Sequence, residues 1–516
     1  MRAMRAALRS LTARGDAALL VVFLTAAALL RFHALAALPP AHYRDVALTA
    51  LDALRAAAGH PCLHYTYDEG LYANLMGLLF VVIGPSDWSV RAPGALFGLL
   101  TCWAVYRLGL ALGLRRAGLY GAGLLAVSFW HVLLSRSGFR AVLLPLLLAG
   151  SFALLARGLE ERDGRRMAWA GALLGLGLHV YPSVYFAPFI LPAYLAAAIG
   201  RSREAWRRAF KGLAIFAATA FLVALPMLLD DLHHPEHVTL PHRIISVFSP
   251  KLDPATVPAY LRRSVVATAL MLHVSGDANW RHNLPGAPML DPLTGALFLL
   301  GCVAVLRVPR ARGAATLLFA WLLAMLLPNL LSVEGVPHGL RSCGILPAVA
   351  LLAGVGLGTL CEALARRVGE RSARGLSLAA ILVLGLWTGH RYFTVWGRDP
   401  QLFAAHDGAY RAASRRLLAA PPGVQLLLIA NGGGYKAYGQ PAEVMAYLFE
   451  MRDRAPVLVG PRDGDRLVLA GRPALVAFVR RDDRILQVIR DLNPGAAVTA
   501  VEAPGLSPDS PVYRIE

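Results

Sequence analysis

The feature that most constrains this chain is a series of long apolar runs that carry almost no charge. A bilayer core about 30 Å thick requires about 20 consecutive apolar residues for one spanning helix. Nine runs between residues 17 and 389 approach or reach that length, and residues 167–200 form a tenth run without any charged residue. As one helix this tenth run would be about 51 Å long, so it predicts two spans broken at Tyr181-Pro182-Ser183. The sequence therefore predicts a mainly α, polytopic membrane protein with about 11 transmembrane helices.

The composition supports this class and excludes soluble enzymes, disordered chains and disulfide scaffolds. Of the 516 residues, 57% are hydrophobic and only 16% are charged, whereas soluble domains carry about 25% charged residues. The formal net charge of +19 is compatible with nucleic-acid binding or with the cytoplasmic loops of a membrane protein. Because the arginines cluster in alternate loops, we interpret the charge as topological and expect no nucleic-acid partner.

The loops also predict an orientation and two domains. If residues 70–85 lie at the interface and do not span, all the arginine clusters fall on one side, and the positive-inside rule places the N-terminus in the cytoplasm. We therefore expect a bacterial-type inner (plasma) membrane protein with a transmembrane domain at residues 1–391 and extracytoplasmic loops at 39–90 and 230–291. Residues 392–516 are expected to form a small soluble α/β domain outside the cell membrane. Its predicted strands are short apolar segments: Val424–Ala430, Pro456–Val459, Leu475–Val479, Ala497–Val501 and Val512–Ile515.

The position of the ionisable residues separates the classes of polytopic protein. Transporters and pumps usually need charged or polar residues inside their spans, near the membrane midplane. In this sequence the spans are nearly free of charge, and the ionisable residues gather at the predicted outer ends of the helices. This distribution favours an enzyme that acts at the membrane surface. A flippase or exporter of lipid-linked sugars and a non-catalytic membrane protein that binds envelope glycans remain the alternatives.

Three carboxylates follow the first predicted span. Asp45 lies directly after it and could act as the general base that takes a proton from an attacking hydroxyl. Asp68 and Glu69 open the next helix and could bind an acceptor, a sugar hydroxyl or a metal. The alternative for all three is an acidic first helical turn, which the helix dipole stabilises.

Several arginines stand at outer span ends, against the positive-inside trend. Arg136 and Arg140 flank the turn between two adjacent spans, and Arg341 follows His338 in a later outer loop. Guanidinium groups bind phosphate through paired hydrogen bonds, so these residues suit a phosphate or pyrophosphate group. The alternative is ion pairing with carboxylates, with Asp45 or Glu69 as the partners of the first two arginines.

Two weaker patterns have ordinary explanations. Four histidines of the second outer loop match no strong zinc-ligand spacing, so we expect a solvated or acceptor-facing loop there. They are His233, His234, His237 and His242. The glycines Gly354, Gly356 and Gly358 fall inside a predicted span, where small residues permit close helix packing.

A set of ordered motifs resembles the polytopic C-type (GT-C) glycosyltransferases. This group includes the dolichyl-phosphate-mannose protein mannosyltransferases and the lipid A aminoarabinose transferase. The resemblance covers about residues 17–400. The motifs are Arg44-Asp45, Gly84-Pro85, Arg91-Ala92-Pro93-Gly94-Ala95, Ser128-Phe129-Trp130-His131, Ser135-Arg136-Ser137-Gly138-Phe139-Arg140, Tyr181 with Phe186-Ala187-Pro188, Asn283-Leu284-Pro285-Gly286, Leu290-Asp291-Pro292 and Pro337-His338-Gly339-Leu340-Arg341.

The resemblance implies a reaction and a set of roles. A sugar would pass, with inversion, from a polyprenyl-phosphate-linked donor to a hydroxyl of a lipid, glycan or protein acceptor, with Asp45 as general base. Asp68, Glu69 and Tyr181 would face the acceptor or the sugar. Five residues would bind the donor phosphate: Arg44, Arg136, Arg140, His338 and Arg341. No cofactor is certain, and a divalent metal is left open.

The chain departs from the family pattern at two points. Asp45 is followed by Val46, where relatives usually have glutamate, so Glu69 becomes a candidate to share the acceptor side. Glu69 is followed by Gly70, where proline is common in the family. The substrate contacts of this region are therefore open.

Overall fold

The computed structural model describes residues 2–66, 68–237, 239, 245–307, 312–433, 435–460 and 463–516, with side chains from residue 15 onward. The chain divides into two compact units. The membrane unit comprises Met1–Ala36, Cys62–Tyr72 and Ser86–Gly397. The α/β unit comprises Ala37–Pro61, Ala73–Pro85 and Arg398–Glu516. Two short stretches that follow the first span thus group with the C-terminal residues.

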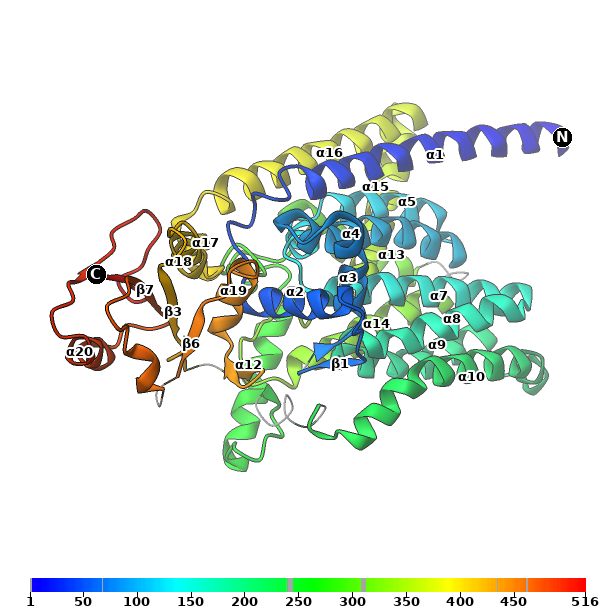
Figure 1. Ribbon diagram of the computed structural model, residues 1–516. Coiled ribbons are helices and arrows are strands. Elements are labelled where there is room, and N and C mark those ends of the chain that lie inside the picture. The colour runs from blue at the N-terminus through cyan, green and yellow to red at the C-terminus, as the bar shows by residue number, and fades with distance from the viewer. Residues whose placement is uncertain are drawn as a thin grey trace. The chain divides into compact units, whose positions relative to one another are not determined.

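The membrane unit is built almost entirely of apolar helices (Figure 1). Among the described residues, eight helical segments are long and apolar enough to cross a membrane, and one bent pair raises this number to nine. The eight contain α1 (Arg2–Phe32), α4 (Asp87–Ala111), α7 (Leu143–Glu161), α9 (Ile190–Ile199), α10 (Arg203–His233), α14 (Arg312–Leu330), α15 (Leu346–Val368) and α16 (Glu370–His390). The chain is therefore a polytopic membrane protein.

The predicted total of about eleven spans comprises these nine segments and two shorter helices. It included α8 (Gly164–Leu176), with 13 residues, and α13 (Pro292–Leu306), with 15 residues. Both are shorter than the 18 residues that a candidate span has here. The remaining described helices of this unit are the bent pair α5 (Arg115–Ala126) and α6 (Phe129–Arg136), and α12 (Val257–Leu270). The predicted break at Tyr181 is confirmed, because this residue is extended and a 3-10 helix, Pro182–Phe189, follows it.

The bend between α5 and α6 is 59° and leaves backbone carbonyls without helical donors. Such groups must find partners inside a bilayer, where no water is available. The buried guanidinium group of Arg31 donates to the carbonyls of Ala126, at 2.9 Å, and Leu125, at 3.4 Å. The hydroxyl of Thr388 donates to the carbonyl of Val127 at 2.6 Å. Polar side chains of α1 and α16 therefore donate hydrogen bonds to the backbone carbonyls at the bend.

Glycines allow three helices of the membrane unit to approach closely. A Cβ atom on Gly356 of α15 would collide with the carbonyl of Leu297 in α13, and one on Gly354 would collide with the carbonyl of Ala117 in α5. The prediction of close packing is confirmed for these two glycines. Gly358 meets only the side chain of Arg116, at ordinary contact distance.

The α/β unit contains a five-stranded sheet in the order β6-β3-β7-β9-β8 (Figure 1). β3 pairs in parallel with β6 and β7, β9 pairs antiparallel with β7, and β8 pairs antiparallel with β9. The strands are β3 (Gln425–Ile429), β6 (Val457–Val459), β7 (Ala474–Phe478), β8 (Val498–Ala500) and β9 (Val512–Ile515). They coincide with the five predicted apolar segments, so the expected small α/β fold is confirmed.

Helices and one hairpin complete this unit. The hairpin consists of β4 (Lys436–Ala437) and β5 (Gln440–Pro441), which pair antiparallel. The helices are α2 (Arg44–Ala57), most of α3 (Leu71–Ile83), α17 (Pro400–Ala405), α18 (Gly408–Leu418), α19 (Glu443–Glu450) and α20 (Asp483–Leu492). Every residue of the central strand β7 is buried.

Candidate functional site

In the membrane unit, the predicted carboxylates Asp68 and Glu69 neutralise Arg140. Its guanidinium group contacts Asp68 at 2.7 Å and Glu69 at 3.0 Å, and it lies over the ring of Tyr181 at 5.6 Å. Asp68 and Glu69 form β2, which pairs with β1 (His64–Tyr65). Burial raises the pKa of Asp68 above its ordinary value, although the charge of Arg140 opposes this. Of the two alternatives for Arg140, phosphate binding and ion pairing with carboxylates, the structure contains the ion pairs.

The same strand pair places His64 beside a second polar cluster. The imidazole of His64 contacts Asp230 at 2.7 Å and Asp231 at 3.7 Å, and its ring centroid lies 4.4 Å from that of His237. Among the described residues, Oδ1 of Asp231 is buried without a hydrogen-bond partner, and Nδ1 of His237 lies 3.3 Å from a carboxylate oxygen of Asp230. His64, Asp231 and His237 are close enough together for one ion to bind all three. Of the four predicted loop histidines, His242 lies outside the described residues.

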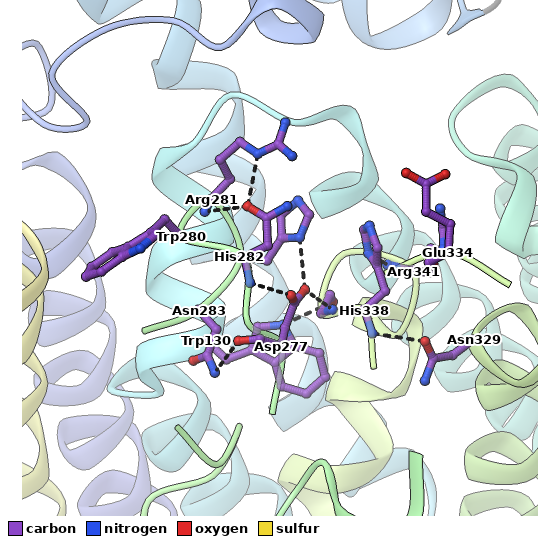
Figure 2. Close-up of polar contacts among 12 residues, drawn as sticks. Trp130, Asp277, Trp280, Arg281, His282, Asn283, Asn329, Glu334, His338 and Arg341 are labelled. Carbon is purple, nitrogen blue, oxygen red and sulfur yellow. Dashed lines mark hydrogen bonds and ion pairs between the residues drawn. The ribbon is translucent and has the colours of Figure 1, made fainter. Parts of the chain in front are cut away.

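A third cluster surrounds the buried carboxylate of Asp277 (Figure 2). Its Oδ2 atom accepts hydrogen bonds from Nδ1 of His282 at 2.9 Å and from the backbone amide of Gly339 at 2.7 Å. The indole of Trp130 donates to the carbonyl of Gly339 at 3.1 Å. These contacts bring together the motifs around Trp130, Asn283 and His338 that lie far apart in the sequence.

His282 and His338 lie face to face in this cluster, with ring centroids 4.5 Å apart. Burial lowers the pKa of His338 well below its ordinary value, and the neighbouring His282 and Arg341 lower it further. Burial also lowers the pKa of His282, although the hydrogen bond to Asp277 opposes this. Both imidazoles are therefore neutral at pH 7. Because Nδ1 of His338 accepts from the backbone amide of Arg341 at 3.3 Å, the hydrogen-bond network assigns its proton to Nε2.

Arg341 belongs to this cluster and has a different environment from the other predicted arginines. Its guanidinium group donates to the carbonyl of Glu334 at 2.6 Å. Within the described part of the chain, no carboxylate lies within ion-pair distance of it. Arg341 is therefore a positive charge beside two neutral imidazoles.

Arg136 is fully buried and its side chain contacts backbone. It donates to the carbonyls of Leu30 at 2.9 Å, Arg31 at 2.7 Å and Ala34 at 3.2 Å, all at the end of α1. Its guanidinium group also lies over the ring of Tyr392 at 4.8 Å. These contacts join the C-terminal end of α1 to α6.

Asp45 and Arg44 lie in the first turn of α2, in the α/β unit. Oδ1 of Asp45 accepts a hydrogen bond from the hydroxyl of Tyr435 at 2.7 Å. Arg44 pairs with Asp407 at 2.9 Å and with the buried Glu443 at 3.1 Å. Burial would lower the pKa of Arg44, but the hydrogen bonding to Asp407 and the negative charges of Asp407 and Glu443 together raise it. Two carboxylates therefore neutralise Arg44.

Several residues of these clusters are absent from the sequence-based site. They are His64, Asp230, Asp231, Asp277, His282 and Tyr435. A signal existed for His282, because it directly precedes the Asn283-Leu284-Pro285-Gly286 motif, and for Asp230 and Asp231, which end an apolar run. No local pattern marks Tyr435, whose partner is 390 residues away in the sequence.

Comparisons with known proteins bear on the fold of the chain. A family model described as dolichyl-phosphate-mannose-protein mannosyltransferase matches residues 71–229. Comparison with curated protein sequences gives no significant match. Among solved structures, ArnT from Cupriavidus metallidurans bound to undecaprenyl phosphate is 15% identical with a TM-score of 0.60, over 96% of this chain and 97% of that chain.

Two further structures have similar folds. The oligosaccharyltransferase of Archaeoglobus fulgidus in the apo form is 13% identical with a TM-score of 0.50, over 94% of this chain and 69% of that chain. The mycobacterial arabinofuranosyltransferase AftD is 17% identical with a TM-score of 0.51, over 96% of this chain and 40% of that chain. The matched family and these proteins are all glycosyltransferases, and the resemblance drawn from the motifs is confirmed. The chain is a polytopic membrane protein with the fold of the GT-C glycosyltransferases.

Proposed function

We propose that the chain is a membrane glycosyltransferase that moves a sugar from a polyprenyl-phosphate-linked donor to a hydroxyl of a cell-envelope acceptor, with inversion. The matched mannosyltransferase family and the fold shared with ArnT bound to undecaprenyl phosphate support this class of donor. In the same proposal the N-terminus is cytoplasmic, and residues 392–516 form an extracytoplasmic domain. The acceptor is a lipid, a glycan or a protein.

The observation that carries the proposal is the environment of Arg341. Arg341 is half-buried, and among the described residues no carboxylate lies within ion-pair distance of it, so a phosphate group would supply the missing negative charge. The Nε2–H group of His338 would donate a further hydrogen bond to a phosphate oxygen. Charge-assisted hydrogen bonds of this kind stabilise the negative charge that grows on a leaving phosphate. Arg341 and His338 are therefore the proposed donor-phosphate residues.

Asp45 is the proposed base. Its carboxylate takes the proton of the acceptor hydroxyl while the hydroxyl oxygen forms a bond to the anomeric carbon of the sugar. The bond between that carbon and the phosphate oxygen breaks, and the polyprenyl phosphate leaves with the electron pair. Asp45 and Arg341 lie in different compact units, so each role rests on the contacts inside its own unit.

The other predicted residues receive narrower roles. Arg140 is paired with Asp68 and Glu69, and we assign this group, with Tyr181, to the sugar or acceptor side. Arg44 and Arg136 already have carboxylate or carbonyl partners, and we assign them to the support of α2 and α1.

A divalent cation is a further part of the proposal. Two imidazoles and a carboxylate are suitable ligands for a transition-metal ion, and His64, Asp231 and His237 offer that set. Within the described part of the chain, Oδ1 of Asp231 accepts no hydrogen bond, and a bound ion would satisfy it. We expect His64→Ala to lower the metal content of the purified protein, and His234→Ala, at an exposed position, to leave it unchanged. Equal metal content in the two variants would exclude this site.

The decisive experiment compares two carboxylates of α2 in a transfer assay. With a radiolabelled polyprenyl-phosphate sugar and cell-envelope extract as acceptor, we expect Asp45→Asn to abolish multiple-turnover transfer and to leave only a slow single-turnover reaction. Asp52→Asn is the matched control, because Asp52 lies two turns later on the same face of α2 and also accepts a tyrosine hydrogen bond. We expect it to retain transfer.

Two outcomes would reject parts of this proposal. Full transfer by a folded Asp45→Asn variant would exclude Asp45 as the base. Movement of the labelled lipid across reconstituted vesicles without any transfer would favour the flippase alternative.

A further inference from the structure

Helix α2 is integrated into the hydrophobic core of the α/β unit. Leu48 of α2 is buried in the same apolar cluster as Leu428 of β3, Val444 and Tyr447 of α19, and Leu475 of β7. Gly77 of α3 lies against the backbone of Ala53, so α3 covers another face of α2. Burying a leucine side chain contributes about 2 kcal/mol. The C-terminal residues therefore fold around a helix that comes from the loop after the first span.

Ion pairs and a hydrogen bond connect the first turn of α2 to other residues of the α/β unit. The backbone amide of Arg44 donates to Asp407 at 2.9 Å, in addition to the ion pairs of its side chain with Asp407 and Glu443. Asp407 adopts a left-handed conformation, with φ 56°, at the start of α18. The residue directly before Asp45 is thus held by backbone and side chain together.

The β4–β5 hairpin contacts one face of α2 through two tyrosines. The hydroxyl of Tyr435 donates to Asp45 at 2.7 Å, and the hydroxyl of Tyr438 donates to Asp52. Asp45 and Asp52 are seven residues apart, which is two helical turns, so they lie on the same face. The guanidinium group of Arg55 lies over the ring of Tyr438 at 5.0 Å.

The turn of this hairpin requires an unfavourable conformation. Tyr438 and Gly439 both have positive φ, at 50° and 75°, as a type I′ turn demands. Glycine and asparagine adopt this conformation at low cost, whereas a tyrosine does so at a cost of about 1–2 kcal/mol. The contact between the hydroxyl of Tyr438 and α2 offsets this cost, which indicates that the hairpin conformation depends on its contact with the helix.

We propose that Tyr435 is a positioning residue for Asp45, and that the C-terminal domain is required for transfer because it orients the proposed base. This inference rests on the proposed function. Asp45 is half-buried, and Tyr435 is 42% exposed. An acceptor hydroxyl can therefore reach the carboxylate, while the hydrogen bond from Tyr435 fixes one of its oxygens. This contact fixes the orientation of the carboxylate as a whole.

The test uses the full-length protein in lipid vesicles and two matched variants. Tyr435→Phe removes the hydroxyl that contacts Asp45, and Tyr438→Phe removes the equivalent hydroxyl that contacts Asp52. We expect Tyr435→Phe to lower kcat about tenfold, the effect of losing one hydrogen bond to a charged group, with KM for the donor unchanged. Tyr438→Phe is expected to keep kcat within about twofold. Thermal unfolding of both variants controls for folding.

A double variant separates positioning from a general structural effect. If Tyr435 acts through Asp45, adding Tyr435→Phe to Asp45→Asn will not lower the residual single-turnover rate further. The reason is that both changes remove the same catalytic contribution, that of the oriented carboxylate. A tenfold additional loss would overturn the inference. So would equal kcat values for Tyr435→Phe and wild type while Asp45→Asn is inactive, and that result would leave the proposed function intact. Full activity of Asp45→Asn would instead reject the proposed base itself.

Discussion

The surroundings of Arg44 in the α/β unit and of Arg341 in the membrane unit differ in how their charge is balanced. Arg44 contacts two carboxylates, Asp407 and Glu443. Arg341 contacts a backbone carbonyl and lies beside the neutral imidazoles of His282 and His338. In sequence, both are arginines at outer span ends on the less basic side of the membrane.

The difference shows which arginine has charge left for a ligand. An ion pair with two carboxylates is complete, so it stabilises the fold and would have to be broken before a phosphate could bind. An arginine among neutral groups gains an ion pair when an anion arrives. Arg341 is therefore the better candidate for the donor phosphate, and Arg44 the better candidate for structural support. Three predictions test this contrast.

The largest expected effect is on transfer by Arg341→Ala. Removing a charged donor from a developing phosphate oxyanion lowers kcat/KM by about 10²- to 10³-fold, whereas the thermal unfolding temperature should change little. Arg341→Lys should recover only part of the activity, because lysine lacks the paired donors of a guanidinium group. Arg262→Ala, at an exposed position on α12, is the control with unchanged transfer. Unaltered transfer by Arg341→Ala would remove the phosphate role.

The next effect is on stability, through Arg44→Ala. The buried Glu443 would lose its closer cation, so we expect a destabilisation of about 2–3 kcal/mol in detergent-based unfolding. The control is Arg480→Ala, which removes the other cation near Glu443, at 3.4 Å, from a largely exposed side chain. That change should cost less than about 1 kcal/mol. Equal costs for the two variants would contradict the structural role of Arg44.

The smallest effect concerns pH. The folded-state pKa values of His282 and His338 are lowered from 6.5, so below pH 6.5 the unfolded chain binds protons that the folded chain does not. Stability should therefore fall as the pH falls below 6.5, by up to about 1.4 kcal/mol per pH unit for each histidine. His338→Gln should reduce this slope, and a bound lipid phosphate should reduce it too, because it favours protonated imidazoles. A slope that is the same in wild type and variant would contradict the assignment of neutral histidines.

Much of the fold follows from local patterns in the sequence. The uncharged runs predict the membrane helices, the proline after Tyr181 predicts the break there, and five apolar segments predict the strands of the C-terminal sheet. The length of each helix follows less directly from the sequence, because an uncharged run does not specify the residues at which its helix begins and ends. The run 292–306 forms a helix of only 15 residues.

The candidate site could be predicted only in part. The resemblance pointed to Asp45, Arg140, His338 and Arg341 as chemically important, because motifs preserve the order of residues along the chain. The resemblance gave all these arginines the same role. The residues next to Arg136 or Arg44 in the sequence do not indicate which groups will neutralise their charges. Their partners come from residues about 100 and more than 360 positions away.

The sequence by itself determined that this chain is a polytopic membrane protein with a small C-terminal α/β domain, because hydropathy and strand periodicity are properties of neighbouring residues. Only the tertiary structure decided which charges are already balanced, and that α2, with Asp45, folds with the C-terminal residues. Charge balance and core packing depend on distances in space between residues that are remote in the chain. That is why Arg44 and Arg341, alike in sequence, have different proposed roles.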